Sequence, residues 1–177
     1  MRVFIGIDIP DSIKDEIEKR VISKLKNKLD NARFVKKDSL HLTLKFIGEV
    51  SDDKLEKIKS SLKGITFSPF KVFLSEIGFF PDKKRPRVMW IGVKDGVEEM
   101  RRIFIEIEER LSKFVEKEKR EFSPHLTIAR FKERKIVELN IPDFSAEFEV
   151  REFILFKSIL LPDGAKYEKI SSFVASY

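Results

Sequence analysis

The chain contains one four-residue phrase twice, and the two copies hold both of its histidines. The phrases run from His41 to Leu44 and from His125 to Ile128, and each has threonine two positions after the histidine. Apolar and polar residues alternate through both phrases, which is the period of a strand with one face in the core. Each phrase therefore predicts a strand that presents an imidazole beside a hydroxyl on its polar face.

Strict alternation assigns the neighbouring side chains to faces. Lys45 is predicted to share the polar face of His41 and Thr43. Arg130 would point away from His125, and only a bulge or a strand end would bring it to the histidine. The core face of the first copy is predicted to hold Leu40, Leu42, Leu44 and Phe46.

The same order of elements surrounds each phrase, a strand and a helix before it and a strand-like segment after it. Caps are expected at Asp11 or Ser12 for the first helix and at Ser51 for the second, and a turn is expected at 162–164. The predicted strands span 3–7, 32–35, the two phrases, 67–80, 88–93, 146–161 and 166–174, and the predicted helices span 11–29, 55–62 and 97–114. We interpret this order as an internal duplication within one sheet-and-helix domain.

Composition excludes several kinds of function. The absence of cysteine rules out disulfides, thiolate nucleophiles and cysteine-based metal sites. No apolar run approaches the ~18 residues of a membrane helix, and the first residues do not resemble a signal peptide, so we expect a soluble cytoplasmic protein that is not bound to a membrane. Abundant Lys, Glu and Ile without glutamine is typical of proteins from hot environments.

The net charge of +6 has a local centre at residues 83–87, where Lys83, Lys84, Arg85 and Arg87 surround a proline. Binding of a polyanion and a solvated loop that merely aids solubility are equally good interpretations of this cluster. Phe79, Phe80 and Trp90 lie close by in the chain and are candidates to stack on a base, although aromatic residues in such apolar strands are more often core.

Two histidines favour acid and base catalysis, because imidazole is the side chain that exchanges protons near neutral pH. One His-x-Thr alone is usually a solvated pair without a role, but two copies with both histidines favour function. One ring would take a proton from the nucleophile while the other gives one to the leaving group, and the hydroxyls would hold a phosphate. The chain has no Gly-x-Ser-x-Gly motif, the elbow that presents the nucleophile of many serine hydrolases, which disfavours a Ser-His-Asp hydrolase. Asp38 and Glu49 flank the first phrase, but no acid closely adjoins the second, which disfavours a metal site.

The phrases and their flanks resemble the two-histidine phosphoesterases, specifically archaeal and bacterial RNA 2′,3′-cyclic phosphodiesterases, also called 2′-5′ RNA ligases. The similar flanks are residues 2–7, 86–92 and 122–130, and the resemblance spans nearly all of the 177 residues. It implies an α+β fold of two pseudo-symmetric lobes, each an antiparallel sheet with helices packed outside, around a central cleft. The expected single bilobal domain, 1–177, has a first repeat of about 1–80, a second of about 86–161 and a C-terminal strand of about 166–174.

The resemblance also implies the reaction, in which an RNA 2′,3′-cyclic phosphate end is hydrolysed to a 2′-phosphate without a metal or cofactor, with weak reverse 2′-5′ ligation. His41 would be the proton donor and His125 the proton acceptor, although the near-symmetry of the motifs leaves either order open from the residues alone. Thr43 and Thr127 would hold the phosphate. Further candidates for phosphate binding are Arg130 and Lys45.

The expected partner is RNA with cyclic phosphate ends, tRNA fragments among them, bound by a monomer. Two alternatives remain open. The same residues would serve a phosphodiesterase acting on small cyclic nucleotides, and a fold of this kind would also suit a non-catalytic module that binds RNA ends.

Overall fold

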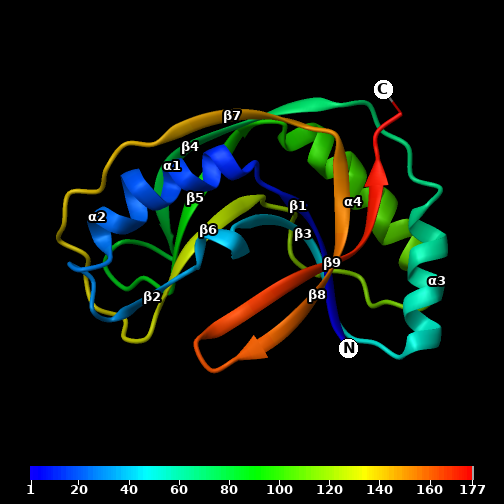
Figure 1. Ribbon diagram of the computed structural model, residues 1–177, viewed down its shortest axis with the longest axis horizontal. Coiled ribbons are helices and arrows are strands. Elements are labelled where there is room, and N and C mark those ends of the chain that lie inside the picture. The colour runs from blue at the N-terminus through cyan, green and yellow to red at the C-terminus, as the bar shows by residue number, and fades with distance from the viewer. Residues whose placement is uncertain (177) are drawn as a thin grey trace.

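Two antiparallel sheets carry the repeated phrases, one phrase in each sheet (Figure 1). The computed structural model describes residues 1–176. Sheet 1 contains, in spatial order, β3 (His41–Glu49), β1 (Arg2–Asp8), β8 (Glu152–Leu161) and β9 (Gly164–Val174). Sheet 2 contains β2 (Ala32–Phe34), β6 (His125–Phe131), β5 (Val88–Asp95), β4 (Phe70–Phe80) and β7 (Ser145–Val150). The predicted α+β class with antiparallel sheets is confirmed.

The two sheets have equivalent strand orders, but each takes its third strand from the other half of the chain. The order β3-β1-β8 in sheet 1 corresponds to β6-β5-β4 in sheet 2. β4 comes from the first half and β8 from the second, so the expected repeats of 1–80 and 86–161 do not each form one sheet. The reason is the short connection at 81–87, because consecutive strands joined by few residues pair as antiparallel neighbours.

The segment predicted as one strand over 146–161 is two strands in different sheets. β7 pairs with β4, and β8 pairs with β1 and β9. Arg151 lies between them outside both strands, and its carbonyl accepts from the amide of Ala175 at 2.7 Å. The prediction missed this break because an apolar alternation does not show when a chain passes from one sheet to the next.

The helices follow the sequence signals with small differences. α1 (Asp11–Ile17), the π-helix η1 (Glu18–Ile22) and α2 (Ser23–Leu25) form one helical segment that ends before the predicted limit of residue 29. Its first carbonyl acceptor is Pro10, so the predicted caps at Asp11 and Ser12 are wrong. In α3 (Asp52–Leu62), the predicted cap is confirmed, because the Ser51 hydroxyl accepts from the amide of Lys54 at 3.2 Å. The remaining helices are the short 3-10 helix η2 (Lys37–Ser39) and α4 (Val97–Leu111).

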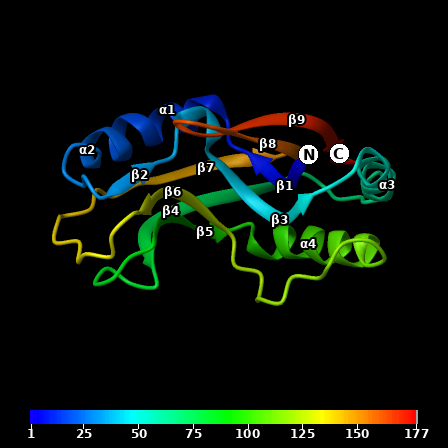
Figure 2. The same ribbon diagram turned by 90° about the horizontal axis from the view of Figure 1, so that it is seen from below.

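One apolar cluster joins the inner faces of both sheets to the helices. α4 contacts β3 and β5 and packs against α3 (Figure 2). The apolar side chains that α4 buries recur every three or four residues and are Met100, Ile103, Ile107 and Leu111. Within residues 1–176, none of the helices is both long enough and apolar enough to cross a membrane.

A β-bulge interrupts the alternation of β3 at Leu44. Thr43 and Lys45 pair with successive residues of β1, and Leu44 lies between them without a partner. Lys45 and Phe46, the two residues after the bulge, therefore point to the faces opposite to those that alternation predicts, and a second irregularity follows at Ile47. Lys45 is buried, with 5% of its surface exposed, whereas Phe46 is 63% exposed on the outer face. The predictions of Lys45 at the phosphate site and Phe46 in the core are both wrong for this reason.

A second bulge lies at the equivalent place in β6. Thr127 and Ala129 pair with successive residues of β5, which leaves Ile128 as the extra residue. Ala129 is fully buried, and Arg130 moves to the face that carries His125. The bulge that alternation required for Arg130 to join the histidine is present.

Lys45 connects three parts of the chain from inside the core. Its ammonium is paired with the carboxylate of Glu108 on α4 and donates to the carbonyl of Glu116 at 3.0 Å. The same carboxylate accepts from the amide of Glu118 at 2.9 Å. The Lys45–Glu108 pair thus connects β3 and α4, and its hydrogen bonds connect both to the segment that leads to β6.

We expect Lys45→Met to lower the free energy of unfolding by about 3–5 kcal/mol, because it leaves Glu108 charged and buried without a partner. The double variant Lys45→Met/Glu108→Leu is expected to recover part of this loss. Urea unfolding measures both values.

The matched control is Lys59→Met, which removes a lysine paired with the exposed Glu56. It is expected to cost less than about 1 kcal/mol. An equal decrease in the free energy of unfolding for Lys45→Met and Lys59→Met would show that the buried ion pair stabilises the protein no more than an exposed one.

Candidate active site

The ring of His41 is held in one orientation by its own strand. Nδ1 lies 2.8 Å from the carbonyl of Ser39, and Nε2 lies 2.9 Å from the hydroxyl of Thr43. A carbonyl only accepts hydrogen bonds, so Nδ1 carries the proton of the neutral ring and Nε2 accepts from Thr43. The nitrogen available for proton exchange is therefore Nε2.

The second motif repeats this arrangement with one difference. Nδ1 of His125 donates to the carbonyl of Ser123 at 2.9 Å, which again leaves the lone pair on Nε2. Within the part of the chain that the structure describes, Nε2 of His125 has no hydrogen-bond partner. The hydroxyl of Thr127 lies on the same face, opposite Trp90 of β5. Both rings thus present Nε2, and the one in His125 is unengaged.

The two motifs share one electrostatic environment. Their strands, β3 and β6, are neighbours in space although they belong to different sheets. The positive charge of Arg130 lowers the pKa of both His41 and His125. A single guanidinium therefore acts on both imidazoles, which the bulge at Ile128 makes possible.

Burial is the main cause that lowers the pKa of each histidine below its ordinary value. The charges around the two rings differ. At His41, Asp8 raises the pKa, while Lys14 and Arg130 lower it. At His125, the nearby charges are Arg130 and Arg120, and both lower the pKa. Of the two rings, His41 is thus the one whose protonated form is stabilised by a nearby carboxylate, that of Asp8.

Asp8 is itself held as a carboxylate. Burial opposes its ionisation, but Lys14 at 2.8 Å and Lys169 at 2.9 Å keep its pKa below the ordinary value. Asp8 lies directly opposite His41 in the pairing of β1 with β3, whereas Gly92 occupies the corresponding place opposite His125. Sequence reasoning missed Asp8, although a comparison of the strands that precede the two phrases shows this difference.

Aromatic side chains surround His41 on its outer face. The rings of Phe4 and Tyr167 lie 4.8 and 4.9 Å from the imidazole, and Phe156 stacks on Phe4 at 5.0 Å. Phe46, which the bulge turns outward, lies 5.9 Å from Phe4. Phe4 and Phe156 are buried, with 3% and 5% of their surface exposed, and back the imidazole from inside the protein, whereas Phe46 is exposed.

On the side of His125, Phe80 meets the imidazole edge-on at 5.2 Å and lies 5.2 Å from Trp90. Phe80 is 40% exposed. The Trp90 ring occupies space that Gly78 leaves, because a Cβ at Gly78 would lie 2.3 Å from it. Phe79 instead packs against Phe131. Of the three aromatic residues considered from the sequence, Phe80 lies beside the histidine, and Trp90 lies beside Phe80 and opposite Thr127.

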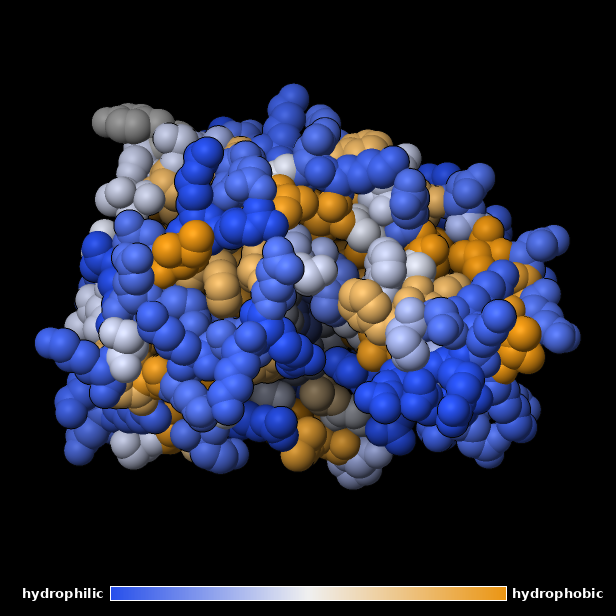
Figure 3. Space-filling view, turned by 180° about the vertical axis from the view of Figure 1, so that it is seen from behind, coloured by the Kyte–Doolittle hydropathy of each residue, from blue (hydrophilic) through white to orange (hydrophobic). Residues whose placement is uncertain are grey.

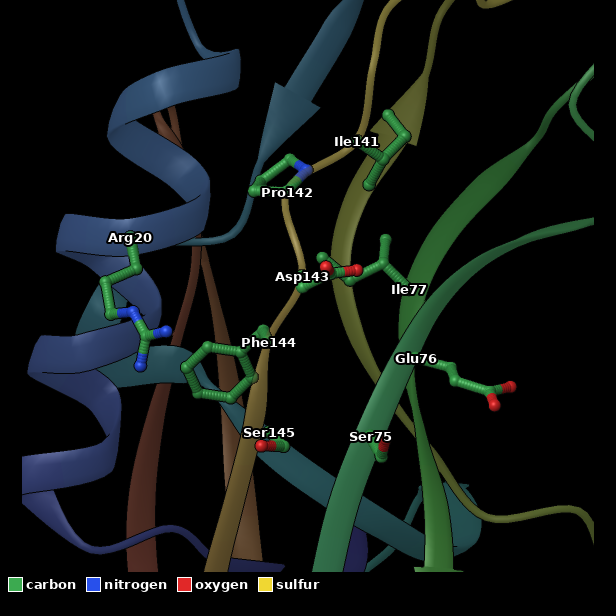
Figure 4. A pocket seen from close by; sticks show the side chains of 9 residues that line it. All are labelled: Arg20, Ser75, Glu76, Ile77, Ile141, Pro142, Asp143, Phe144 and Ser145. Carbon is green, nitrogen blue, oxygen red and sulfur yellow. The ribbon is translucent and has the colours of Figure 1, made fainter.

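The surface is hollowed near the middle of the face seen in Figure 3, where hydrophilic side chains border the recess. A separate cavity of about 470 Å³ lies between the first helical segment and strands β4 and β7 (Figure 4). There the Arg20 guanidinium lies 5.6 Å from the Phe144 ring, and Glu76 points away from the other lining residues. This cavity contains neither histidine and is not the candidate site.

The acids near the first motif do not form a metal site. Glu49 pairs with the amino terminus at 3.1 Å. Among residues 1–176, histidine and carboxylate side chains do not gather in groups of three that would hold a metal ion. The candidate site therefore consists of the two histidines, the two threonines and Arg130, with Asp8 beside His41.

Comparisons with known proteins find relatives that match nearly the whole chain. The family model described as "LigT like Phosphoesterase" matches the chain twice, over residues 7–90 and 91–167. The chain is 36% identical to an RNA 2′,3′-cyclic phosphodiesterase of Archaeoglobus fulgidus, covering 98% of this chain and 99% of the relative. It is 39% identical to one of Methanocaldococcus jannaschii, covering 96% and 98%. The fold is similar to that of Escherichia coli LigT in a crystal structure with 3′-AMP, with a TM-score of 0.84, 24% identity and coverage of 99% and 98%.

We expect both imidazoles to titrate below the ordinary value of about 6.5, and Asp8→Asn to lower the pKa of His41 further. The reason is that the substitution removes the one acidic charge that favours the protonated ring. NMR titration of the two ring signals measures both values in one sample. His125 is the internal control, and an equal shift of both rings would contradict a local effect of Asp8.

The lowered pKa values also link stability to pH. Below about 6.5 the histidines of the unfolded chain take up protons while those of the folded chain stay neutral, so the free energy of unfolding falls as pH falls towards the folded values. Replacing both histidines with asparagine is expected to remove this part of the dependence in urea unfolding.

Proposed function

Because the chain belongs to the family of LigT-like phosphoesterases, we propose that it is an RNA 2′,3′-cyclic phosphodiesterase that uses both histidines. The observation that carries the proposal is the matched pair of rings, each held through Nδ1 and each presenting Nε2 beside a threonine, under the charge of one arginine. Two proton-exchanging groups are what hydrolysis of a phosphodiester needs.

In the proposed reaction, neutral His125 takes a proton from water through Nε2 as the water oxygen bonds to phosphorus. The bond between phosphorus and the 3′ oxygen breaks on the opposite side, and protonated His41 gives its Nε2 proton to that oxygen. The product is a 2′-phosphate with a free 3′-hydroxyl. His41 ends neutral and His125 ends protonated, so exchange with solvent restores the enzyme.

The surroundings of the rings support this order of roles. Asp8 favours the protonated form of His41, which suits the acid. The charges near His125 are arginines, which favour its neutral form and suit the base. The unengaged Nε2 of His125 is also open to a water molecule, whereas Nε2 of His41 is bonded to Thr43.

Thr43, Thr127 and Arg130 are the proposed phosphate-binding groups. The two hydroxyls lie on the histidine faces of β3 and β6, and the bulge in β6 turns Arg130 to the same face as Thr127. Their hydrogen bonds and positive charge would stabilise the negative charge that grows on the non-bridging oxygens in the transition state. Lys45 has no part in this, because its ammonium is paired in the core.

The proposal extends to two finer points. Water attack with imidazole acid and base needs no metal ion, so we infer a metal-independent reaction. An RNA 5′-hydroxyl in the place of water would give a 2′-5′ linkage through the same kind of transition state, so weak ligation accompanies hydrolysis. The proposed substrates are RNAs that end in a 2′,3′-cyclic phosphate, tRNA fragments among them.

We expect His41→Ala and His125→Ala each to lower kcat by roughly 10² to 10⁴, because each removes one proton-transfer group. The assay separates the products of an RNA with a defined 2′,3′-cyclic phosphate end, with and without a chelator. Wild-type protein is expected to release only the 2′-phosphate at an unchanged rate in the chelator.

The control variant is Lys59→Met, because the partner of Lys59, Glu56, lies on the exposed side of α3. Lys14 would not serve as a control, because it contacts Asp8. Full turnover by either histidine variant would contradict the mechanism. Binding of the RNA end without turnover by wild-type protein would favour a non-catalytic module. Loss of activity in the chelator would overturn the metal-independent step.

The pH profile of kcat/KM is expected to be bell-shaped with its maximum below about 6.5, because it reports the free enzyme and both histidines have lowered pKa values there. One ring must be protonated and the other neutral, and this combination is most populated between the two lowered values. Steady-state rates at low substrate concentration from acid to neutral pH measure the profile. A maximum above about pH 7 would contradict the assignment of both limbs to these histidines.

A further inference from the structure

A second arginine lies directly beside Arg130. Arg33 of β2 pairs with Arg130 of β6 in the antiparallel register, so the two side chains project from the same face of sheet 2. Both are exposed. Like charges at directly opposite positions of a sheet destabilise it, so this pair is unfavourable without an anion.

Three more arginines gather at the same end of sheet 2, where β6 ends and β5 begins. Arg134 donates through Nε and Nη2 to the carbonyl of Arg85, at 3.3 and 3.0 Å. The carbonyl of Arg87 accepts from the amide of Phe131, one residue beyond Arg130. Burial lowers the pKa of Arg134, and the charges of Arg87 and Arg85 lower it further. We call Arg33, Arg85, Arg87 and Arg134 the arginine cluster.

The arginine cluster has almost no compensating negative charge. In the structure of residues 1–176, none of its members forms an ion pair with a carboxylate. Asp82 is close, but its carboxylate accepts from the amides of Lys84 and Arg85. Five arginines elsewhere in the chain are paired with glutamate, namely Arg20, Arg101, Arg110, Arg120 and Arg151, whereas Arg2 and Arg102 form no ion pair within residues 1–176. Most of the arginines without an ion pair thus gather at the end of sheet 2 that carries Arg130.

We propose that the arginine cluster binds backbone phosphates of RNA that precede the cyclic end, so that the protein acts faster on oligonucleotides than on mononucleotides. This inference rests on the proposed function, in which Arg130 holds the terminal phosphate. Arg33 is the neighbour of Arg130 on the same face and therefore contacts the next phosphate of the strand. Guanidinium groups suit this role because their planar donors match phosphate oxygens.

The chemistry of the substrate gives the cluster a selective effect. A cyclic mononucleotide has a single phosphate, which binds at the two histidines. It has no second phosphate that the arginine cluster could bind. A strand of RNA carries one charge per nucleotide, and binding it releases counter-ions, so each phosphate that the cluster neutralises strengthens binding and its dependence on salt. The cluster therefore separates the RNA activity from action on small cyclic nucleotides.

The test compares kcat/KM for a 2′,3′-cyclic mononucleotide and for an RNA of about ten nucleotides that ends in the same nucleotide, a length that exceeds the roughly four nucleotides of the smallest single-strand sites. The variants are Arg33→Gln and Arg85→Gln/Arg87→Gln. The matched controls are Arg151→Gln and Arg101→Gln/Arg151→Gln, which remove the same charge from arginines paired with glutamate.

We expect Arg33→Gln to lower kcat/KM for the RNA roughly fivefold and the double variant more, with the mononucleotide rate unchanged. The slope of log kcat/KM against log salt for the RNA is expected to become shallower by about 0.7 for each phosphate that a variant no longer neutralises. The controls are expected to change neither rate. Equal effects of cluster and control variants on the RNA, or an equal decrease on both substrates, would overturn the proposal.

A binding measurement distinguishes a failure of the proposed catalytic function from a failure of the arginine cluster to bind RNA. If wild-type protein turns over neither substrate, fluorescence anisotropy with the same RNA ending in a 3′-phosphate still reports binding. Weaker binding by the cluster variants than by the controls then supports the cluster as a surface that binds RNA, and equal binding overturns it.

Discussion

The two β-bulges at Leu44 and Ile128 are the constraint on which the site depends. Each adds one residue to a histidine strand, and because side chains alternate, the faces of the residues that follow it are exchanged, in β3 as far as a second irregularity at Ile47. The first bulge buries Lys45 and exposes Phe46, and the second buries Ala129 and brings Arg130 to His125. Without the bulges the histidines would keep their places, but alternation would place Lys45 on the face of His41 and Ala129, in place of Arg130, on the face of His125.

The equivalent positions of the two halves differ in chemistry although their backbones repeat. Asp8 faces His41 where Gly92 faces His125, and Phe46 follows the first bulge where Arg130 follows the second. A symmetric frame thus holds an aromatic cluster with a carboxylate beside His41 and a guanidinium on the side of His125. This difference is what lets two similar imidazoles take opposite roles, because proton donation and acceptance need different electrostatic surroundings.

The bulge at Leu44 also affects the packing of the core, because it buries Lys45 and pairs it with Glu108. A lysine in the core is costly unless its charge is compensated and its protons are bonded, and Glu108 with the carbonyl of Glu116 meets both needs. The carboxylate also holds the amide of Glu118, in the segment that leads to Ser123 and His125. The strand of one histidine is thereby connected to the approach of the other, so the bulge contributes to the relative placement of the two motifs.

The sequence by itself determined the two histidine strands and the threonines beside the imidazoles, because strand alternation and the repeated phrase are local signals, and its resemblance to a known family implied the α+β class. It also showed that Arg130 needs a bulge to reach the histidine. Only the tertiary structure decided the places of Lys45, Phe46 and Asp8, the division of residues 146–161 between two sheets, and the exchange of β4 and β8. The physical reason is that register and cross-strand neighbours arise from the pairing of distant segments, and a single added residue in one strand reverses a face without leaving a mark in the local pattern.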